Sequence, residues 1–425
     1  MLTLAPVVYL SACLIDGQPA QGDCPDGFVM DSGGLCLETD SGDAGDTGDT
    51  GADSGNDSGS DTAIDTDTDT DSGGDTATDT GTDTGPDTGT DTGSGATLVC
   101  ASGGDFTSIT DAINAASDGD SIEVCPGTYT ECLVIDKPIT LMATGAVEDT
   151  IIEPGRAECA VDIQAYGEVT LRSLTFANGV GEVGGALYAT DTDLIVEDCV
   201  FRDSVTAAVT IRIEEGSLSM SDSEVIDTEA ATAPGLWTYD VDVHLENTVF
   251  ARNVATGSMG DALYFGAGDV ELFNVLVTEA ETEGGSIVST SADSLFIVNS
   301  VFDGASAVYV MFSDSSHGST YTLENSVVYG NGARVGLGFG ASPTLEYSIV
   351  YDTDYPLCIA SSCADLPATN GNLTSDPRFT DPDAGDWTLD SFSPCIDAGN
   401  PAAAYNDPDG SRNDIGIYGG PGGSW

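Results

Sequence analysis

Three aromatic residues and one arginine recur at nearly equal intervals in the middle of the chain. These residues are Tyr188, Arg212, Trp237 and Tyr264, spaced 24, 25 and 27 residues apart. Aromatic rings stack on sugar rings, and a guanidinium group donates paired hydrogen bonds to oxygen atoms. Glu214 and Tyr239 follow two residues after Arg212 and Trp237. On one surface these side chains are suited to bind carbohydrate; the alternative is that the rings stabilise a sheet by contacting one another.

The elements that would position these residues form a repeat. Its pattern is an apolar residue, any residue, Asn or Asp, a small residue, any residue, and Phe or Val. It reads IVEDCVF (195–201), LENTVF (245–250), LFNVLV (272–277), IVNSVF (297–302), LENSVV (323–328) and LEYSIV (345–350), with weaker copies LRSLTF (171–176) and MSDSEV (220–225). Its third position holds Ser173, Asp198, Asp222, Asn247, Asn274, Asn299, Asn325 and Tyr347, at spacings of 22 to 27 residues.

This period predicts a parallel β-helix of about ten coils, because each repeat contains two or three short β-like runs split by Gly, Asp or Asn. Neighbouring coils of such a fold stack about 4.8 Å apart. The Asn and Asp positions would then form a hydrogen-bonded ladder at one tight turn. The alternatives are another kind of solenoid or an all-β sandwich.

The repeat also predicts which side chains point outward. Eleven residues before the Asn/Asp position stand Leu187, Ile211, Leu236 and Leu263, and Ile287 stands twelve before it. These residues are expected in the core, so the next residue in each strand should point outward. The expected outward column is Tyr188, Arg212, Trp237, Tyr264 and Val288, with Tyr309 as a further candidate. Thr190, Glu214, Tyr239 and Gly266 should point outward two residues later.

The same period explains some cysteine spacings. Cys100 and Cys125 are 25 residues apart, and Cys132 and Cys159 are 27 apart. Residues one period apart lie above one another at a disulfide-compatible distance, so both pairs are predicted to bridge neighbouring coils. Cys24 and Cys36 are expected to close a small loop, and Cys199 is expected to be a buried free thiol. The pairing of Cys358, Cys363 and Cys395 stays open.

Both ends of the repeat region carry further motifs. DFTSITDAINAASDGDSIEVCPGTYTE (105–131) places Ile109, Ala112, Ile113 and Ala116 on one helical face that could cover the first coil. DPRF (376–379), SPCIDAGNP (393–401) and DPDGSRNDIGIYGG (407–420) form the other end. Together with the repeat, these segments resemble the right-handed parallel β-helix proteins of the pectin-lyase-like superfamily over 97–425. The resemblance implies a C-terminal cap on the last coil.

The resemblance also raises an enzymatic alternative. In that superfamily the outer face often carries a polysaccharide groove, and its lyases use an Arg or Lys base beside Ca²⁺ held by acids. Arg212, Glu214 and Asp240, with Glu215 and Asp242 nearby, are the place where such a set could assemble. However, an acidic surface repels a polyuronate, and an arginine among carboxylates keeps its proton. We therefore expect no catalytic residues, with a polysaccharide lyase as the alternative.

The charge of the chain is strongly negative. The 425 residues contain 72 acids and nine bases, a formal net charge of −63. This balance excludes a nucleic-acid partner, since nothing could neutralise a run of phosphates. Residues 40–96 repeat Asp, Thr, Gly and Ser with almost no apolar side chain and are expected to form a disordered stalk. The alternative for this segment is a weak cation-binding sponge.

The N-terminus predicts export. Residues 1–12 form a short apolar run, and Leu10-Ser11-Ala12-Cys13 resembles the lipobox of bacterial lipoproteins, in which the cysteine is lipidated. The alternative is an ordinary secretory signal. The expected location is the cell envelope, anchored in the outer membrane or on the extracellular surface. Contact with the membrane is expected through the lipid anchor only.

One metal site is predicted near the C-terminus. Asp407, Asp409 and Asp414 surround Gly410, and alternating Asp with a Gly bend suits Ca²⁺. The alternative is a polar turn. The histidines, His244 and His317, are expected to be structural or solvated.

These observations predict five segments: a signal peptide (1–12), a lipid-anchored segment with a small Cys loop (13–39), the stalk (40–96), the β-helix (97–375) and its cap (376–425). The expected function is non-catalytic binding or structural display at the cell surface, with an extracellular glycan or another cell-surface component as partner. Calcium is the only cofactor considered, and the protein is expected to be a monomer.

Overall fold

A computed structural model describes residues 28–30, 36–38 and 96–423, apart from 156–159, 182–183, 258–259, 283, 305–306, 314–318 and 361. The chain divides into two units, residues 1–88 and 89–425. In the first unit, β1 (Phe28–Met30) pairs antiparallel with β2 (Cys36–Glu38). Cys13, the side chains of Cys24 and Cys36, and the stalk up to residue 95 lie outside the described residues. No helix in the described ranges is long and apolar enough to cross a membrane.

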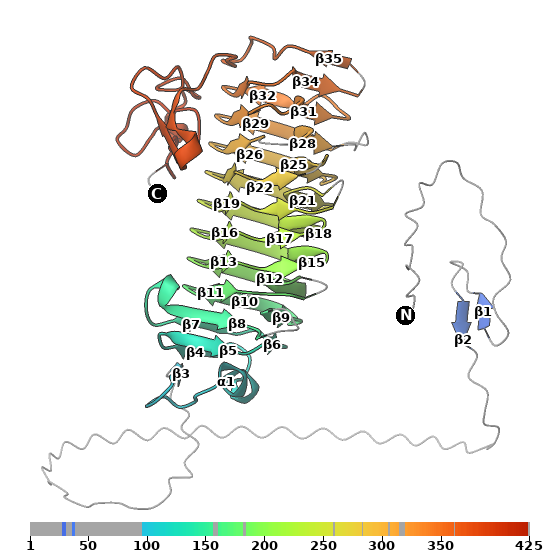
Figure 1. Cartoon of the computed structure of the whole chain (residues 1–425), viewed down its shortest axis with the longest axis vertical. Helices are drawn as coiled ribbons and strands as arrows, with labels where there is room; N and C mark the ends of the chain where they lie inside the picture. The colour runs from blue at the N-terminus through green and yellow to red at the C-terminus, as the bar shows by residue number, and fades with distance from the viewer. Residues whose placement is uncertain are drawn as a thin grey trace, which may run out of the picture. The chain divides into compact units, whose positions relative to one another are not determined.

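The second unit is a parallel β-helix, as the repeat predicts (Figure 1). One face, called the third face here, is a sheet of ten parallel strands with one strand from each coil, which confirms the expected number of coils. Its strands are β5 (Gly127–Thr130), β8 (Thr150–Glu153), β11 (Thr175–Ala177), β13 (Val200–Arg202), β16 (Glu224–Ile226), β19 (Val249–Ala251), β23 (Leu276–Thr278), β27 (Val301–Asp303), β30 (Val327–Tyr329) and β33 (Ile349–Tyr351).

The other two faces belong to one continuous sheet, because three long strands bend from one face into the next. These strands are β12 (Leu187–Glu197), β15 (Val209–Ser221) and β18 (Ala233–Glu246). The first face contains their N-terminal halves with β6 (Leu133–Ile135), β9 (Val161–Ile163), β21 (Leu263–Gly266), β25 (Ser286–Thr290), β28 (Tyr309–Ser313), β31 (Val335–Phe339) and β34 (Tyr355–Ile359). The second face contains their C-terminal halves with β3 (Thr97–Val99), β4 (Ser121–Val124), β7 (Thr140–Ala143), β10 (Gly167–Arg172), β22 (Asp269–Phe273), β26 (Ser294–Val298), β29 (Thr320–Glu324) and β32 (Thr344–Glu346).

Short strands extend some coils. A small sheet contains β14 (Val205–Thr206), β17 (Glu229–Ala230), β20 (Val254–Ala255) and β24 (Glu281–Thr282). At the last coil, β35 (Ser362–Ala364) runs antiparallel to β34. Near the C-terminus, β36 (Phe379–Asp381) pairs with β37 (Asp386–Leu389). Three single turns of 3-10 helix, η1 (Val147–Asp149), η2 (Pro382–Ala384) and η3 (Ala403–Tyr405), complete the elements.

The turn that joins the second face to the third face repeats the same backbone conformation in successive coils. All eight residues at the Asn/Asp position of the repeat have φ between 48° and 54°, in the left-handed region. Asn and Asp adopt this region more readily than other side chains, which explains why they recur there. Side chains link neighbouring coils at two places: Ser173 donates to Asp198 at 2.8 Å, and Asn247 donates to Asp222 at 3.1 Å.

Farther along the chain the same asparagines bind the C-terminal segment instead. Asn274 donates to the carbonyls of Ile417 (2.7 Å) and Gly419 (3.0 Å). The Asn299 amide exchanges hydrogen bonds with the Asn413 amide, both at 3.1 Å. The residues at this turn therefore bond to neighbouring coils in the first half of the β-helix and to the C-terminal segment in the second half.

The C-terminal segment differs from the expected cap. Residues 376–423 lie along the side of the coils and not over the last one (Figure 1). They cover the outer surface of the third face, where Trp387 and Ile415 join a buried cluster with Val301 and Val327. The physical reason is that these outward side chains of the third face are apolar and need cover. At the last coil, Ile349 forms an isolated parallel β-bridge with Leu373, a residue that precedes the C-terminal segment.

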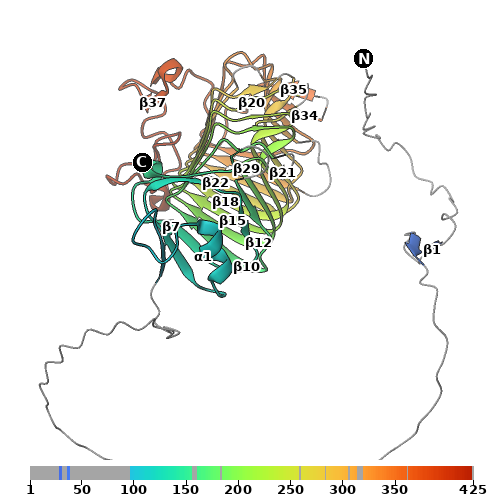
Figure 2. The ribbon, with the colours of Figure 1, turned by 60° about the horizontal axis from the view of Figure 1, so that its bottom comes forward.

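The one α-helix among the described residues, α1 (Ile109–Ala115), packs on the first coils (Figure 2). Ile109, Ala112 and Ile113 are buried in the main core, and Ala116 packs against it. Glu131 fixes the start of α1, since its carboxylate accepts hydrogen bonds from the hydroxyl of Ser108 and the backbone of Ile109 and Thr110 at 2.9 to 3.1 Å.

These contacts predict an acid-sensitive stabilisation. Burial favours a higher pKa for Glu131, but the hydrogen bonds from Thr110, Ser108 and Ile109 outweigh it and lower its pKa below the ordinary value of 4.5. A lowered folded-state pKa stabilises the fold above pH 4.5, and this contribution is lost as the pH falls through the folded-state pKa. We expect Glu131→Gln to cost about 1 kcal/mol at neutral pH and less in acid.

Denaturant titrations at neutral pH and below pH 4.5 measure this difference. Glu148→Gln is the control, because Glu148 is exposed and lies in the neighbouring coil. A loss for Glu131→Gln that is the same at both pH values would contradict the assignment.

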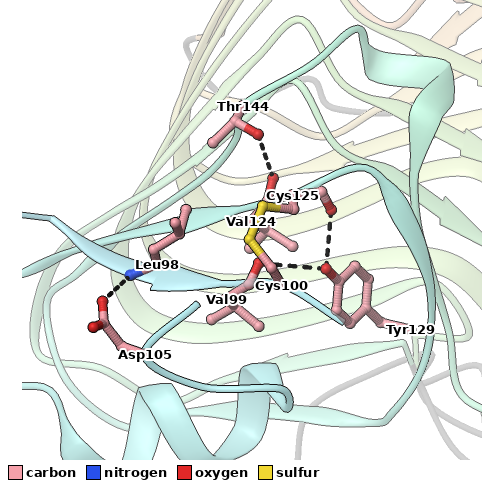
Figure 3. The surroundings of a disulfide bond; sticks show 8 residues. All are labelled: Leu98, Val99, Cys100, Asp105, Val124, Cys125, Tyr129 and Thr144. Carbon is pink, nitrogen blue, oxygen red and sulfur yellow. Dashed lines mark hydrogen bonds between the residues drawn. A yellow bond between two sulfur atoms is a disulfide. The ribbon is translucent and has the colours of Figure 1, made fainter. Parts of the chain in front are cut away.

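The cysteines confirm part of the predicted pairing. Cys100 and Cys125 form a disulfide between the first coils, with Cα atoms 5.0 Å apart. Beside it, the Tyr129 hydroxyl donates to the Cys125 carbonyl at 2.9 Å (Figure 3). Cys159 lies outside the described residues, so the Cys132–Cys159 pair stays a prediction. Cys358 and Cys363, left open above, form a disulfide between β34 and β35.

Two cysteines are buried thiols. Cys199 is fully buried, as expected, and donates to the carbonyls of Glu197 and Leu171 at 3.4 and 3.5 Å. Burial raises the pKa of its thiol to about 12. Cys395 belongs to the C-terminal segment and is buried against the third face, and burial raises its pKa to about 12 as well. Both thiols are therefore poor nucleophiles at neutral pH.

Candidate functional site

The candidate site is a column of outward side chains on the first face. The strand register pairs Tyr188 with Arg212, Arg212 with Trp237, and Trp237 with Tyr264. One residue earlier, Leu187, Ile211, Leu236 and Leu263 pair with one another and are buried. The predicted alternation of core and outward residues is therefore present in these four coils.

The next positions of the column differ from the expectation. Val288 pairs with Leu263 and is buried in the core, so the residue that follows Tyr264 in the column is Ser289. The column then continues through Phe312, which pairs with Ser289, and not through Tyr309, which pairs with Ser286. The spacing to the ladder turn is the same as in the preceding coils, because Val288 stands eleven residues before Asn299, whereas Ile287, from which the expected column was counted, stands twelve before it.

Arg212 is held by an acid on one side and a ring on the other. Its guanidinium donates to Glu214 at 2.6 Å and lies 4.5 Å from the centre of the Trp237 ring. Glu214 also accepts a hydrogen bond from the Tyr188 hydroxyl at 3.1 Å. Burial, followed by this hydrogen bond, raises the pKa of Tyr188, so the hydroxyl stays protonated at neutral pH.

The aromatic rings of the column stack on one another. The Trp237 and Tyr264 rings are 5.7 Å apart and inclined by 13°. Because Arg212 covers one side of the indole ring and Tyr264 lies parallel to it one coil away, Trp237 has little free surface for a sugar ring. This packing is the cross-strand stabilisation named above as the alternative role of the rings.

Tyr239 is the exposed ring of the group. Its side chain is 52% exposed, although the ring lies nearly parallel to that of Trp237, with centres 6.2 Å apart. Gly266 is its neighbour in the next coil, and a Cβ atom there would lie 3.0 Å from the Tyr239 ring. The absence of a side chain at Gly266 therefore leaves space for the Tyr239 ring. An exposed ring beside Glu214 and Arg212 is suited to stack on a sugar and to hydrogen-bond its hydroxyls.

The acids of the alternative lyase site are spread along a bend. Glu215 and Asp240 occupy left-handed positions, with φ of 57°, where β15 and β18 pass from the first to the second face. The nearby Asp191 carboxylate, which is the main cause, raises the pKa of Glu215. In the described part of the chain, no hydrogen bond or ion pair joins Asp240 or Asp242 to Arg212. Of the alternative catalytic set, Arg212 and Glu214 are therefore in contact, whereas Asp240 lies at the bend.

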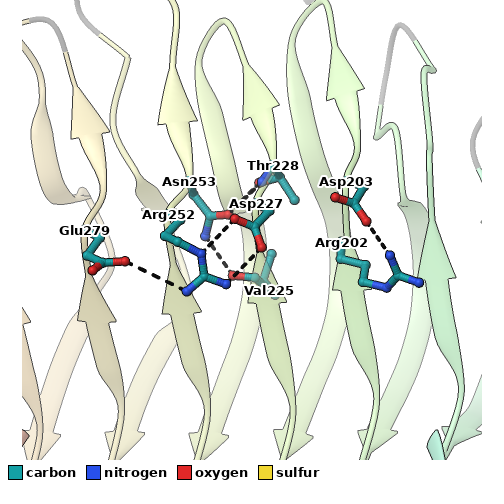
Figure 4. Close-up of polar contacts among 8 residues, drawn as sticks. All are labelled: Arg202, Asp203, Val225, Asp227, Thr228, Arg252, Asn253 and Glu279. Carbon is teal, nitrogen blue, oxygen red and sulfur yellow. Dashed lines mark hydrogen bonds and ion pairs between the residues drawn. The ribbon is translucent and has the colours of Figure 1, made fainter. Parts of the chain in front are cut away.

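The remaining arginines near the turns pair with acids, as the charge of the chain suggests. Arg252 donates two hydrogen bonds to Asp227 and lies 3.8 Å from Glu279, and Arg202 pairs with Asp203 (Figure 4). Arg172 pairs with Glu197 in the same way. These are surface ion pairs that neutralise single acids and are worth little individually.

The predicted calcium ligands are engaged with the backbone. Asp407 accepts from the amides of Gly420 (2.7 Å) and Asp414, and Asp409 accepts from Ser411 (2.8 Å). Asp414 accepts from the Asp397 amide at 2.6 Å. Across the described residues, no group of three His, Cys, Asp or Glu side chains is arranged to hold a metal ion. These hydrogen bonds shape the C-terminal segment, and Ca²⁺ binding by Asp407, Asp409 and Asp414 stays a prediction.

One histidine is described. His244 lies on the second face, 3.2 Å from Glu271 and with its ring 5.3 Å from that of Phe273. These contacts agree with the structural role expected for it. His317 lies outside the described residues.

Three solved structures are similar to this chain in strand arrangement. A pectin methylesterase from Aspergillus niger has 16% identity, with 71% of this chain and 98% of that one covered, at a TM-score of 0.35. A pectin methylesterase from carrot has 12% identity, 66% and 86% coverage, and a TM-score of 0.37. Pectate lyase Pel9A has 13% identity, 76% and 97% coverage, and a TM-score of 0.39. No protein-family model and no curated protein matches the sequence.

Proposed function

We propose that this chain is a non-catalytic glycan-binding protein displayed at the cell surface. The observation that carries the proposal is the exposed ring of Tyr239 on the first face, beside the polar network of Glu214, Arg212 and Tyr188. Protein sites for sugars combine a flat apolar ring with a few fixed polar groups, which is the combination found here. Trp237 supports this surface by stacking with Tyr239, and Tyr264 in turn stacks on Trp237.

The contacts of Arg212 speak against the lyase alternative. A proton-abstracting arginine needs a neutral guanidine group beside the substrate. The carboxylate of Glu214 and the ring of Trp237 both favour the guanidinium cation, and both contacts occupy the group. The negative charge of the chain also disfavours a polyuronate substrate.

Display at the cell surface rests on the sequence. Leu10-Ser11-Ala12-Cys13 supports a lipid anchor in the cell envelope, and the acidic stalk would extend by charge repulsion. In this proposal the anchor holds the chain to the membrane, the stalk spaces the β-helix from it, and the first face meets an extracellular glycan or another cell-surface component. The protein acts as a monomer.

A glycan panel tests binding and cleavage together. The chain is incubated with immobilised glycans in the presence of Ca²⁺, and retention and the release of unsaturated sugars are both measured. We expect retention of at least one glycan and no release, with Arg212→Ala weakening retention because it removes the partner of Glu214.

The outcomes separate the alternatives. Release of unsaturated sugars that disappears in Arg212→Ala would show that the chain is a lyase. If no glycan is retained and Trp237→Ala only lowers the melting temperature, the column has a structural role alone.

A further inference from the structure

The outward column ends at a cavity that the sequence analysis did not anticipate. Phe312 pairs with Gly338, and Gly338 pairs with Cys358 in the last coil. Around these positions lies a cavity of about 720 Å³. Its aromatic lining comes from Tyr309, Phe312, Phe339 and Tyr355. This volume lies in the range of sites for small molecules.

Two features preform this cavity. Gly338 has no side chain, and a Cβ atom there would lie 2.8 Å from the Tyr309 ring, so only glycine lets that ring lie across β31. The disulfide between Cys358 and Cys363 fixes β35 against β34, and both cysteines line the cavity. One wall of the cavity is therefore held covalently.

Arg334, which also lines the cavity, has an unusual lack of partners. The other arginines among the described residues form an ion pair with a carboxylate or donate to backbone carbonyls; they are Arg172, Arg202, Arg212, Arg252, Arg378 and Arg412. Within the described ranges, no ion pair or hydrogen bond engages the guanidinium of Arg334. In a chain with 72 acids, a guanidinium without an acid partner at the rim of an aromatic cavity is available to a ligand.

We propose that this cavity binds a ring compound that carries one carboxylate. The guanidinium of Arg334 would bind the carboxylate through two hydrogen bonds, and Tyr309, Phe312 and Tyr355 would contact the ring. Asp354 lies beside Arg334 in the strand register, because Tyr355 pairs with Val335, but no ion pair joins the two within the described residues. A ligand with one negative charge is also repelled less by the acidic chain than a polyuronate is.

Two classes of compound share this chemistry: a sugar with a carboxylate, such as galacturonate, and an aromatic acid, such as benzoate. The cavity shares no residue with the Tyr239 surface, so this inference can be tested independently of the proposed glycan binding.

Isothermal titration calorimetry of the full chain tests the inference. The probes are galacturonate and benzoate, each with its neutral counterpart, galactose and benzyl alcohol. We expect one of the acids to bind and its neutral counterpart not to bind. Binding of galacturonate but not benzoate would identify a sugar acid as the ligand class. Binding of benzoate but not galacturonate would identify an aromatic acid.

Variants locate the binding. Arg334→Gln is expected to weaken binding of the acid at least tenfold, because it removes a charged hydrogen-bond pair. Tyr355→Ala, which removes an exposed ring of the lining, should weaken it as well. Arg172→Gln, on the second face, is the control and should leave the affinity unchanged. The inference is overturned if neither acid binds, if a neutral counterpart binds equally well, or if Arg334→Gln binds as wild type does.

Discussion

Asn299→Ala is expected to lower the free energy of unfolding of the β-helix by about 4 kcal/mol. The Asn299 side chain is 2% exposed and exchanges hydrogen bonds with Asn413, while also donating to the carbonyls of Asp414 and Gly416. Alanine would leave these buried groups without partners. It would also have to adopt a φ of 50°, which is costly for a residue with a Cβ and no local side-chain hydrogen bond.

Chemical denaturation of Asn299→Ala and Asn247→Ala measures this effect against a matched control. Asn247 occupies the same turn with a φ of 49°, but within the described ranges its amide bonds only to Asp222 in the neighbouring coil. The control should therefore lose about 1 to 2 kcal/mol, from the strained backbone and one exposed hydrogen bond. Equal losses for the two variants would show that docking of the C-terminal segment adds nothing at Asn299.

This comparison bears on how the β-helix is closed. The amides of Asn274, Asn299 and Asn325 all bind residues between Ala398 and Gly420. The same C-terminal segment covers the third face through Trp387 and Ile415. Through these asparagines the segment ties three neighbouring coils together from the side, and its loss would expose apolar side chains of the third face.

The repeat made the fold predictable. Coils of nearly constant length must stack in register, so the period alone places Tyr188, Arg212, Trp237 and Tyr264 in one column. The recurring Asn and Asp likewise marked a turn, because the left-handed conformation selects them. A spacing of 25 residues was sufficient to predict the Cys100–Cys125 disulfide.

Features without a period escaped prediction. Val288 is an exception, because it stands eleven residues before Asn299 like the core residues of the preceding coils, and that constant spacing would have placed Ser289 in the column. The contacts between Asn299 and Asn413 join residues 114 positions apart, and no local pattern announces them. The cavity at Arg334 depends on a missing side chain at Gly338 and on the hairpin of β34 and β35. A run of alternating glycines, VGLGF (335–339), was the one available signal.

Tyr239→Ala is expected to weaken binding of any retained glycan at least tenfold. The ring is the exposed apolar surface of the proposed site, and loss of its stacking on a sugar corresponds to about 1.4 kcal/mol or more. The fold should tolerate the change, because the ring is half exposed and its removal leaves Trp237 stacked on Tyr264. An unchanged melting temperature would separate lost binding from lost structure.

The most direct test of glycan binding at the first face is the affinity of three proteins for the glycan that the panel retains best. These are the wild type, Tyr239→Ala and the control Tyr166→Ala, in which a tyrosine that is 82% exposed and lies outside the column is removed. The proposed site predicts at least tenfold weaker binding for Tyr239→Ala and wild-type affinity for Tyr166→Ala. Equal affinities for wild type and Tyr239→Ala, with both proteins folded, would contradict it.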